Sequence, residues 1–221
     1  LMIRRPPRST LDRSSASSVV YKRQNIPNDI YFVIDKNSDL NSNLPHILPN
    51  KDIWEKIMSS KGITNNDKIV VYDNSKVLSS CRLWYMLLYF GHSKKLVSVL
   101  NGGLEKWKKN NLPITEDHTK LKMTNYKAHE NKFMVKNLDE IDKNIENKVF
   151  SLVDARSKDR FEGKTKEPRE GVRSGSIKNS ICIPFNNVIK DDKTFKDKEK
   201  LKYIVDEYNL LKEQMVNKMI S

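Results

Sequence analysis

The residues best suited to chemistry in this sequence are arginines that follow one short apolar run. The run ends at Asp154, and the arginines are Arg156, Arg160, Arg169 and Arg173. A guanidinium is a planar fork that binds a carboxylate or another oxyanion through two parallel hydrogen bonds. Several such forks beyond the end of a buried strand predict a pocket for a small anion.

Acidic residues alternate with these arginines, which leaves a second interpretation open. They are Asp154, Asp159, Glu162, Glu167 and Glu170. A solvated loop with surface ion pairs would have the same composition, and such pairs contribute little to stability. Composition alone favours the solvated loop over the anion pocket.

The other groups capable of nucleophilic or proton-transfer chemistry are two cysteines and a His–Asp pair. Cys81 and Cys182 each lie beside or within an apolar run, where a packed thiol is the ordinary role. Two cysteines make no disulfide framework, which favours a reducing compartment. Asp35 and His46 lie close in sequence, and histidine is the natural proton carrier near neutral pH. A histidine in a polar loop is as readily an ordinary surface residue.

Hydrophobic periodicity predicts the elements that must position these side chains. Short apolar runs predict buried strands at 69–72, 96–100 and 149–154. Helices are expected to begin after Asn50, to cover the wholly apolar run 83–90, and to begin again near Leu104 and Asn137. Strand and helix alternate at short spacing, which predicts a parallel sheet covered by helices on both faces.

Residues 1–24 differ in composition from the rest of the chain. They are rich in Arg and Ser, poor in acids, and lack the apolar core of a secretory signal. The segment resembles the translation of a sequencing-adapter read. We therefore expect a non-native segment that takes no part in the fold, with an organellar transit peptide as the alternative.

The stretch from Val149 to Phe185 also resembles a known family. The run VDARSKDRFEG…EPREGVRSGSI…IPF resembles the opening of the second domain of the two-domain rhodanese family, the thiosulfate and 3-mercaptopyruvate sulfurtransferases. The pieces VVYD, CRLWYMLLYFGH and VSVLNGGLEKW are similar to that family's first domain.

The resemblance implies an α/β protein of tandem rhodanese-like domains, each a parallel sheet flanked by helices. The first domain, residues 25–128, would lack its first strand and be catalytically silent. A linker is expected at 129–146. Residues 147–221 would be the N-terminal part of a second, incomplete domain that is marginally stable on its own.

The same resemblance implies a function and its site residues. Arg160 and Arg169 match arginines that hold the substrate's anionic group, and Asp35 and His46 match a proposed proton relay. The parent protein would move sulfane sulfur from 3-mercaptopyruvate or thiosulfate to cyanide or a thiol through a Cys persulfide, without a metal or organic cofactor. The nucleophilic Cys is expected just after Ser221, so the chain as given is predicted to be inactive. Asp73 stands at the nucleophile's place in the first domain.

Two other functions remain open from the sequence. One is a non-catalytic rhodanese-like module that binds anions or a protein partner. The other is a nucleic-acid binder, indicated only by the net charge of +13. The lysines are spread out without an aromatic stacking platform, so we expect no nucleic-acid partner. We expect no membrane partner, a monomer, and a cytoplasmic location, or a mitochondrial one in a eukaryote.

Overall fold

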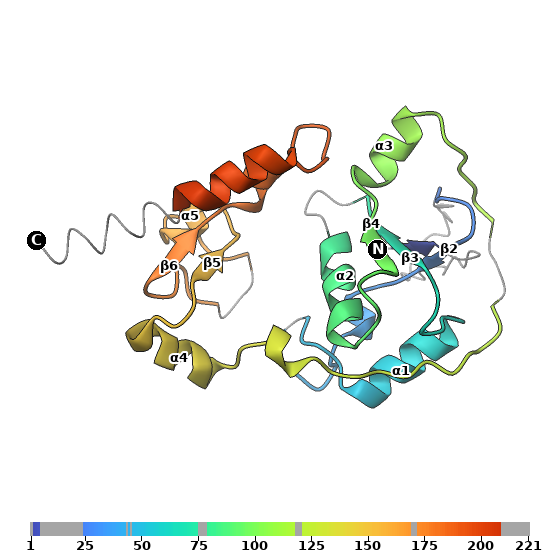
Figure 1. Ribbon diagram of the computed structural model, residues 1–221, viewed down its shortest axis with the longest axis horizontal. Coiled ribbons are helices and arrows are strands. Elements are labelled where there is room, and N and C mark those ends of the chain that lie inside the picture. Colours follow the sequence, from blue (N-terminus) through green and yellow to red (C-terminus); the bar gives the residue numbers. More distant parts are fainter. Residues whose placement is uncertain are drawn as a thin grey trace, which may run out of the picture. The chain divides into compact units, whose positions relative to one another are not determined.

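The computed structural model describes residues 2–4, 24–42, 44, 46–74, 79–117, 121–168 and 172–208 (Figure 1). The chain divides into two compact units, Leu1–Val135 and Lys136–Ser221. The boundary between them falls inside the segment predicted to link two domains. No described helix has the length and apolar character needed to cross a membrane.

A four-stranded sheet forms the centre of the first unit. Its strands are β1 (Met2–Arg4), β2 (Asp29–Tyr31), β3 (Ile69–Tyr72) and β4 (Val97–Val99), in the order β2-β1-β3-β4. The strands β3 and β4 are parallel, because helix α2 (Ser80–Tyr89) provides the crossover between them. The predicted strands at 69–72 and 96–100 are therefore confirmed.

Two expectations about this sheet are wrong. Met2–Arg4 belongs to the segment that was expected to stay outside the fold, yet it lies between β2 and β3. It runs antiparallel to both neighbours, so the sheet is mixed rather than purely parallel. Backbone hydrogen bonds alone can insert so short a strand, and three residues are too few to show a period-2 pattern.

Helix α1 (Lys51–Ser60) begins and packs as its sequence predicts. The Asn50 side chain accepts a hydrogen bond from the Ile53 N–H at 2.9 Å, which satisfies a donor that the first turn leaves unpaired. Trp54 and Met58, one turn apart, are completely buried. Trp54 packs against two rings, stacking on Phe90 with centroids 4.6 Å apart.

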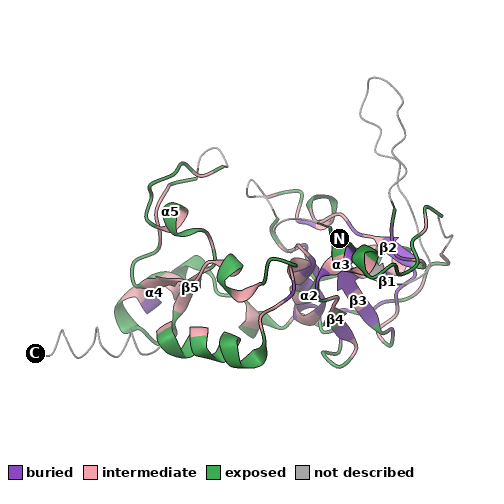
Figure 2. Ribbon diagram, turned by 90° about the horizontal axis from the view of Figure 1, so that it is seen from above, coloured by how far each residue is buried: buried purple, intermediate pink, exposed green. Residues whose placement is uncertain are grey.

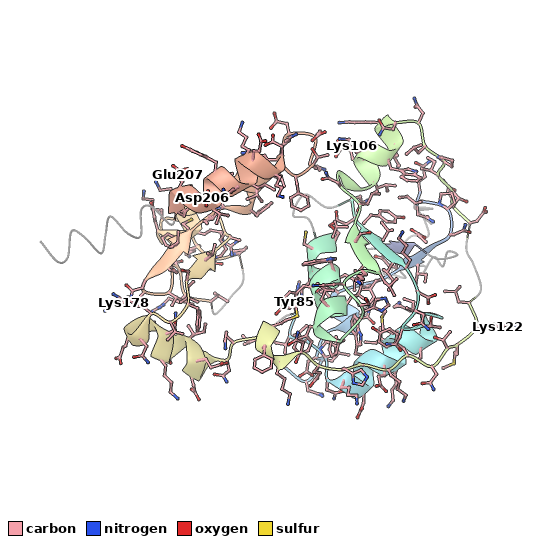
Figure 3. The ribbon with its side chains drawn as sticks, viewed as in Figure 1. Tyr85, Lys106, Lys122, Lys178, Asp206 and Glu207 are labelled. Carbon is pink, nitrogen blue, oxygen red and sulfur yellow. The ribbon has the colours of Figure 1, made fainter. Side chains whose placement is uncertain are left out.

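Helix α2 is less buried than its wholly apolar sequence predicts. Leu83, Met86 and Leu87 are completely buried, whereas Trp84 is 37% exposed. Tyr85, labelled in Figure 3, is partly buried and donates its hydroxyl to the Met134 carbonyl. The third helix, α3 (Gly103–Lys109), follows β4 after a turn in which Gly102 has a φ of 92°.

The polar stretch after α3 contributes to the first core. Tyr126 and Ala128 are both completely buried in it. The backbone N–H groups of His129 and Asn131 donate to carbonyls at the end of α2, at 3.0 and 2.7 Å. This stretch leads into a short 3-10 helix, η2 (Lys132–Met134), and the first unit ends at Val135. Another 3-10 turn, η1 (Asp35–Asn37), follows β2.

The second unit begins with helix α4 (Leu138–Asn147), which carries a complete capping box. Asn137 accepts from the Glu140 N–H, and Glu140 accepts from the Asn137 N–H, both at 2.9 Å. Asn144 then exchanges two hydrogen bonds of 2.9 Å with the backbone of Phe150, which fixes the helix against the approach to the next strand.

A parallel pair of strands follows α4. They are β5 (Leu152–Asp154) and β6 (Ser180–Cys182), and Asp154 lies opposite Cys182. Between them comes α5 (Lys158–Phe161), and after them come η3 (Phe185–Val188) and a helix over 198–208.

Burial differs sharply between the two units (Figure 2). Every completely buried hydrophobic side chain among the described residues belongs to the first unit. In the described part of the second unit, only the polar residues Asn144 and Thr194 are buried. Val153, at the centre of β5, is 55% exposed. The second unit therefore has little hydrophobic burial of its own to offset the entropy of ordering its chain.

We predict that residues 136–221, expressed alone, unfold without a cooperative transition. The reason is the absence of a buried apolar cluster among the described residues of this unit. Circular dichroism during heating should show a gradual, featureless change. A sharp sigmoidal transition would contradict the prediction, and residues 1–135 prepared in the same way serve as the control.

Candidate anion-binding site

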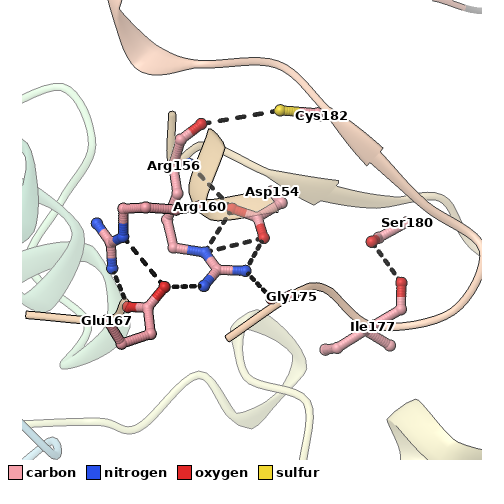
Figure 4. Close-up of polar contacts among 8 residues, drawn as sticks. All are labelled: Asp154, Arg156, Arg160, Glu167, Gly175, Ile177, Ser180 and Cys182. Carbon is pink, nitrogen blue, oxygen red and sulfur yellow. Dashed lines mark hydrogen bonds and ion pairs between the residues drawn. The ribbon is translucent and has the colours of Figure 1, made fainter. Parts of the chain in front are cut away.

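Arginines and acids at the carboxyl end of β5 form one connected cluster (Figure 4). Its members are Asp154, Arg156, Arg160 and Glu167. Asp154 ends β5, Arg156 follows two residues later, and Arg160 lies on α5. The carboxyl ends of parallel strands are the usual place for ligand sites in α/β proteins.

Arg156 donates from all three of its guanidinium nitrogens to hold the cluster together. Its Nε donates to the Asp154 carboxylate at 3.0 Å, and its Nη2 donates to the same carboxylate at 2.5 Å and to the Gly175 carbonyl at 2.7 Å. Its Nη1 donates to Glu167 Oε1 at 2.7 Å. Each terminal nitrogen is thus committed to an internal acceptor, which gives Arg156 a structural role.

Arg160 is bound along one edge only. Its Nε donates to Glu167 Oε1 at 3.1 Å, and its Nη2 donates to Glu167 Oε2. No acceptor among the described residues is recorded for its Nη1, and the side chain is 34% exposed. Arg160 therefore keeps a whole edge for an external anion, whereas each nitrogen of Arg156 already donates within the cluster.

The acids of the cluster are held in the charged form. The hydrogen bond from Arg160, followed by the charges of Arg160 and Arg156, keeps the pKa of Glu167 below its ordinary value. Hydrogen bonding from Arg156 likewise keeps the pKa of Asp154 below its ordinary value, although burial acts in the opposite direction. The Asp154 contact in turn raises the pKa of Arg156.

These pKa shifts predict an acid limit for the cluster. The carboxyls of Asp154 and Glu167 have lower pKa values in the folded chain than the value of about 4 expected when unfolded. Their ion pairs therefore stabilise the folded cluster fully above about pH 4, and this stabilisation is lost as the pH falls through the folded pKa values. The Nε–H signals of Arg156 and Arg160, followed by NMR, should persist at about pH 5 and disappear in stronger acid. Loss of these signals near neutral pH would contradict the assignment to carboxylates.

The solvated-loop interpretation holds only in part. Ion pairs do form, but the side chain of Glu167 is only 4% exposed. Of the four arginines named in the sequence, the cluster contains Arg156 and Arg160. Arg173 is exposed and, within the described residues, forms no ion pair with Asp154 or Glu167. Arg169 lies outside the described residues, so its substrate-binding role stays a prediction.

The proposed relay residues are in contact within the first unit. His46 Nε2 lies 2.8 Å from Asp35 Oδ1, and the two side chains are 41% and 74% exposed. The His46 carbonyl accepts from Arg82 Nη2 at 2.7 Å, which ties this loop to α2. The contact is a fact of the structure; the proton-relay role stays a prediction.

The place after β3 is occupied by a structural carboxylate. Asp73 is 6% exposed, and its Oδ2 accepts from the Ser80 N–H, the first residue of α2, at 2.7 Å. Its carbonyl accepts from the Leu104 N–H at 3.0 Å. Asp73 thus satisfies backbone donors at the starts of two helices.

Both cysteines are poorly suited to act as thiolates. Burial, followed by the nearby Asp73 charge, raises the pKa of Cys81. Burial, followed by the charges of Asp154 and Glu162, raises the pKa of Cys182. Because the thiolate is the reactive form, both thiols are expected to be poor nucleophiles near neutral pH.

The chain is similar in sequence and in fold to proteins of known family. The family model of the rhodanese-like domain matches residues 4–110. The thiosulfate/3-mercaptopyruvate sulfurtransferase 1 of Arabidopsis thaliana, described as mitochondrial, is 33% identical over 215 residues, covering 86% of this chain and 55% of that protein. The chain is a rhodanese-family homologue.

Further relatives of this rhodanese homologue are also named for sulfur transfer involving 3-mercaptopyruvate. The 3-mercaptopyruvate sulfurtransferase of Mus musculus is 32% identical, covering 85% of this chain and 63% of that protein. The crystal structure of SseA, a 3-mercaptopyruvate sulfotransferase from Escherichia coli, superposes with a TM-score of 0.75 at 26% identity, covering 90% of this chain and 74% of that one. The chain thus spans a little over half the length of the curated relatives it matches, from 55% to 63%.

Sequence reasoning missed the roles of two members of the site. Glu167 was seen as one acid among several, although it is the residue that joins both arginines. Arg156 was grouped with the anion-binding candidates, although its donors are committed internally. An acid within eleven residues of both arginines is the available signal, but the sequence does not show which charges meet.

Proposed function

We propose that this chain provides the anion-binding part of a sulfurtransferase that moves sulfane sulfur from 3-mercaptopyruvate or thiosulfate to a thiol or cyanide. The observation that supports this most strongly is the open edge of Arg160. A guanidinium with one edge anchored can bind a carboxylate or sulfonate group with its other edge, and so fix the donor's orientation. Arg169 is proposed as its partner.

The proposed reaction has two displacement steps. A cysteine thiolate attacks the outer sulfur of thiosulfate or the thiol sulfur of 3-mercaptopyruvate. A new S–S bond forms, while the S–S bond of thiosulfate breaks to release sulfite or the C–S bond of 3-mercaptopyruvate breaks to release the pyruvate enolate. The acceptor then attacks the outer sulfur of the persulfide and regenerates the thiolate. The leaving enolate takes up a proton, and the Asp35–His46 pair is proposed as the relay that supplies it.

We propose that neither Cys81 nor Cys182 forms this persulfide, because burial and neighbouring carboxylates raise the pKa of both thiols. The persulfide cysteine would then lie outside these 221 residues. This proposal separates binding from turnover, so the chain should bind the donor without consuming it.

The test is a titration of the 221-residue chain with thiosulfate and with 3-mercaptopyruvate, followed by two-dimensional NMR. We expect shifts centred on Arg160 and no loss of donor. Mass spectrometry after incubation should show no added sulfur on either cysteine. A failure to bind either donor would overturn the proposed anion site, and a persulfide on Cys81 or Cys182 would overturn the assignment of the nucleophile.

A further inference from the structure

The orientation of Arg160 depends on a single carboxylate. A guanidinium offers two edges for bidentate binding: one formed by Nε and Nη2, and one formed by Nη1 and Nη2. Glu167 occupies the first edge, with Nε–Oε1 at 3.1 Å and a second contact from Nη2 to Oε2. No residue in the described part of the chain supplies an acceptor to Nη1, so the second edge is the one that an external ligand can take.

Glu167 is itself held in place by Arg156, which is anchored to strand β5. Arg156 Nη1 donates to Glu167 Oε1 at 2.7 Å. Arg156 is in turn held by Asp154, the last residue of β5. A chain of contacts thus connects β5 through Arg156 and Glu167 to Arg160, as the dashed lines in Figure 4 show. With 4% of its side chain exposed, Glu167 has little freedom to take another position.

We propose that Glu167 is a positioning residue, which fixes the plane of Arg160 so that the Nη1–Nη2 edge binds the anionic group of the sulfur donor. This inference rests on the proposed function, because it takes Arg160 as the donor-binding arginine. It adds the edge that binds the donor and the residue that selects this edge.

A purely electrostatic view of Glu167 makes the opposite prediction. The cluster holds two carboxylates and two guanidinium groups, so its charges cancel. Removing the Glu167 charge would leave the cluster positive, and Coulomb attraction alone would then strengthen anion binding. Positioning predicts weaker binding instead, because a mobile guanidinium must lose rotational freedom when the anion binds. The sign of the effect separates the two views.

The experiment measures thiosulfate affinity of the full 221-residue chain by NMR titration. Glu167→Gln keeps the size of the side chain and one acceptor oxygen but removes the charge. We expect roughly tenfold weaker binding, the size of one lost charge-assisted hydrogen bond. Glu162→Gln is the matched control. It removes the same charge from a residue that pairs with Lys158 and Lys164. The thiosulfate affinity of this variant should stay at or above the wild-type value.

A double-mutant cycle tests whether Glu167 acts through Arg160. If it does, Glu167→Gln should weaken binding no further in a chain that already carries Arg160→Ala. A general structural role would instead add a second loss. If Glu167→Gln does not fold, Glu167→Asp replaces it. Glu167→Asp keeps the charge but draws the carboxylate back by one methylene group. Positioning therefore predicts weaker binding of thiosulfate, whereas a purely electrostatic effect predicts unchanged binding.

The outcomes distinguish this inference from the proposed function. Wild-type chain that does not bind thiosulfate would overturn the function and the inference with it. Binding that is lost with Arg160→Ala, but is unchanged or tighter with Glu167→Gln, would overturn the inference and leave the function standing.

Discussion

Replacing Arg160 by alanine is expected to weaken thiosulfate binding by roughly 10- to 100-fold, the range for losing a charge-assisted bidentate contact. The substitution removes both edges of the guanidinium at once, including the edge that Glu167 leaves open. It also leaves the Glu167 carboxylate with Arg156 as its remaining arginine partner in the cluster. The affinity can be read from the same NMR titration that tests the proposed function.

Two further variants separate geometry from charge. Arg160→Lys keeps the positive charge but loses the planar fork, so we expect it to recover only a small part of the affinity. Lys158→Ala removes one positive charge from the same helix at a side chain that is 76% exposed. It should bind nearly as well as the wild type. Equal losses from Lys158→Ala and Arg160→Ala would show that net charge alone drives binding.

Replacing Trp54 by alanine should destabilise the first unit by about 3–5 kcal/mol, the usual cost of truncating a fully buried aromatic side chain. Trp54 is completely buried, stacked on Phe90 and 5.9 Å from the Phe32 ring. Few side chains could move to fill the cavity, because these rings belong to a close-packed core. Urea unfolding followed by circular dichroism measures the change in the free energy of unfolding.

Trp84→Ala provides the matched control for this prediction. The residue type is the same and the helix belongs to the same unit, but Trp84 is 37% exposed. Its removal should cost at most about 1 kcal/mol, as is usual for surface substitutions. Equal destabilisation by the two variants would contradict the core that the structure describes.

The sequence predicted best where local rules decide the outcome. Helices α1 and α4 each begin after an asparagine whose side chain accepts a backbone hydrogen bond, and that signal lies within three residues. The parallel pairing of β3 and β4 follows from the helix between them. Such features depend on neighbours in sequence and can be read without the fold.

The sequence was a poorer guide where distant residues meet. Strand β1 depends on backbone pairing with two strands far along the chain, and its side-chain pattern is too short to show this. The exposure of Trp84 depends on what covers its face of α2, and an apolar run does not show that. Glu167 joins arginines seven and eleven positions away, and its choice among several cations depends on the loop that carries it. Which arginine stays open to a ligand is a property of that geometry.

The carboxylate of Asp73 permanently occupies the position at the start of α2 where a free anion could otherwise bind. Its carboxylate receives the N–H that begins α2, so a negative charge attached to the chain already satisfies the start of that helix. A position of this kind needs no solute anion to be stable, and donor concentration should not alter it. The start of α2 is therefore already occupied by the chain itself, unlike the outer edge of Arg160.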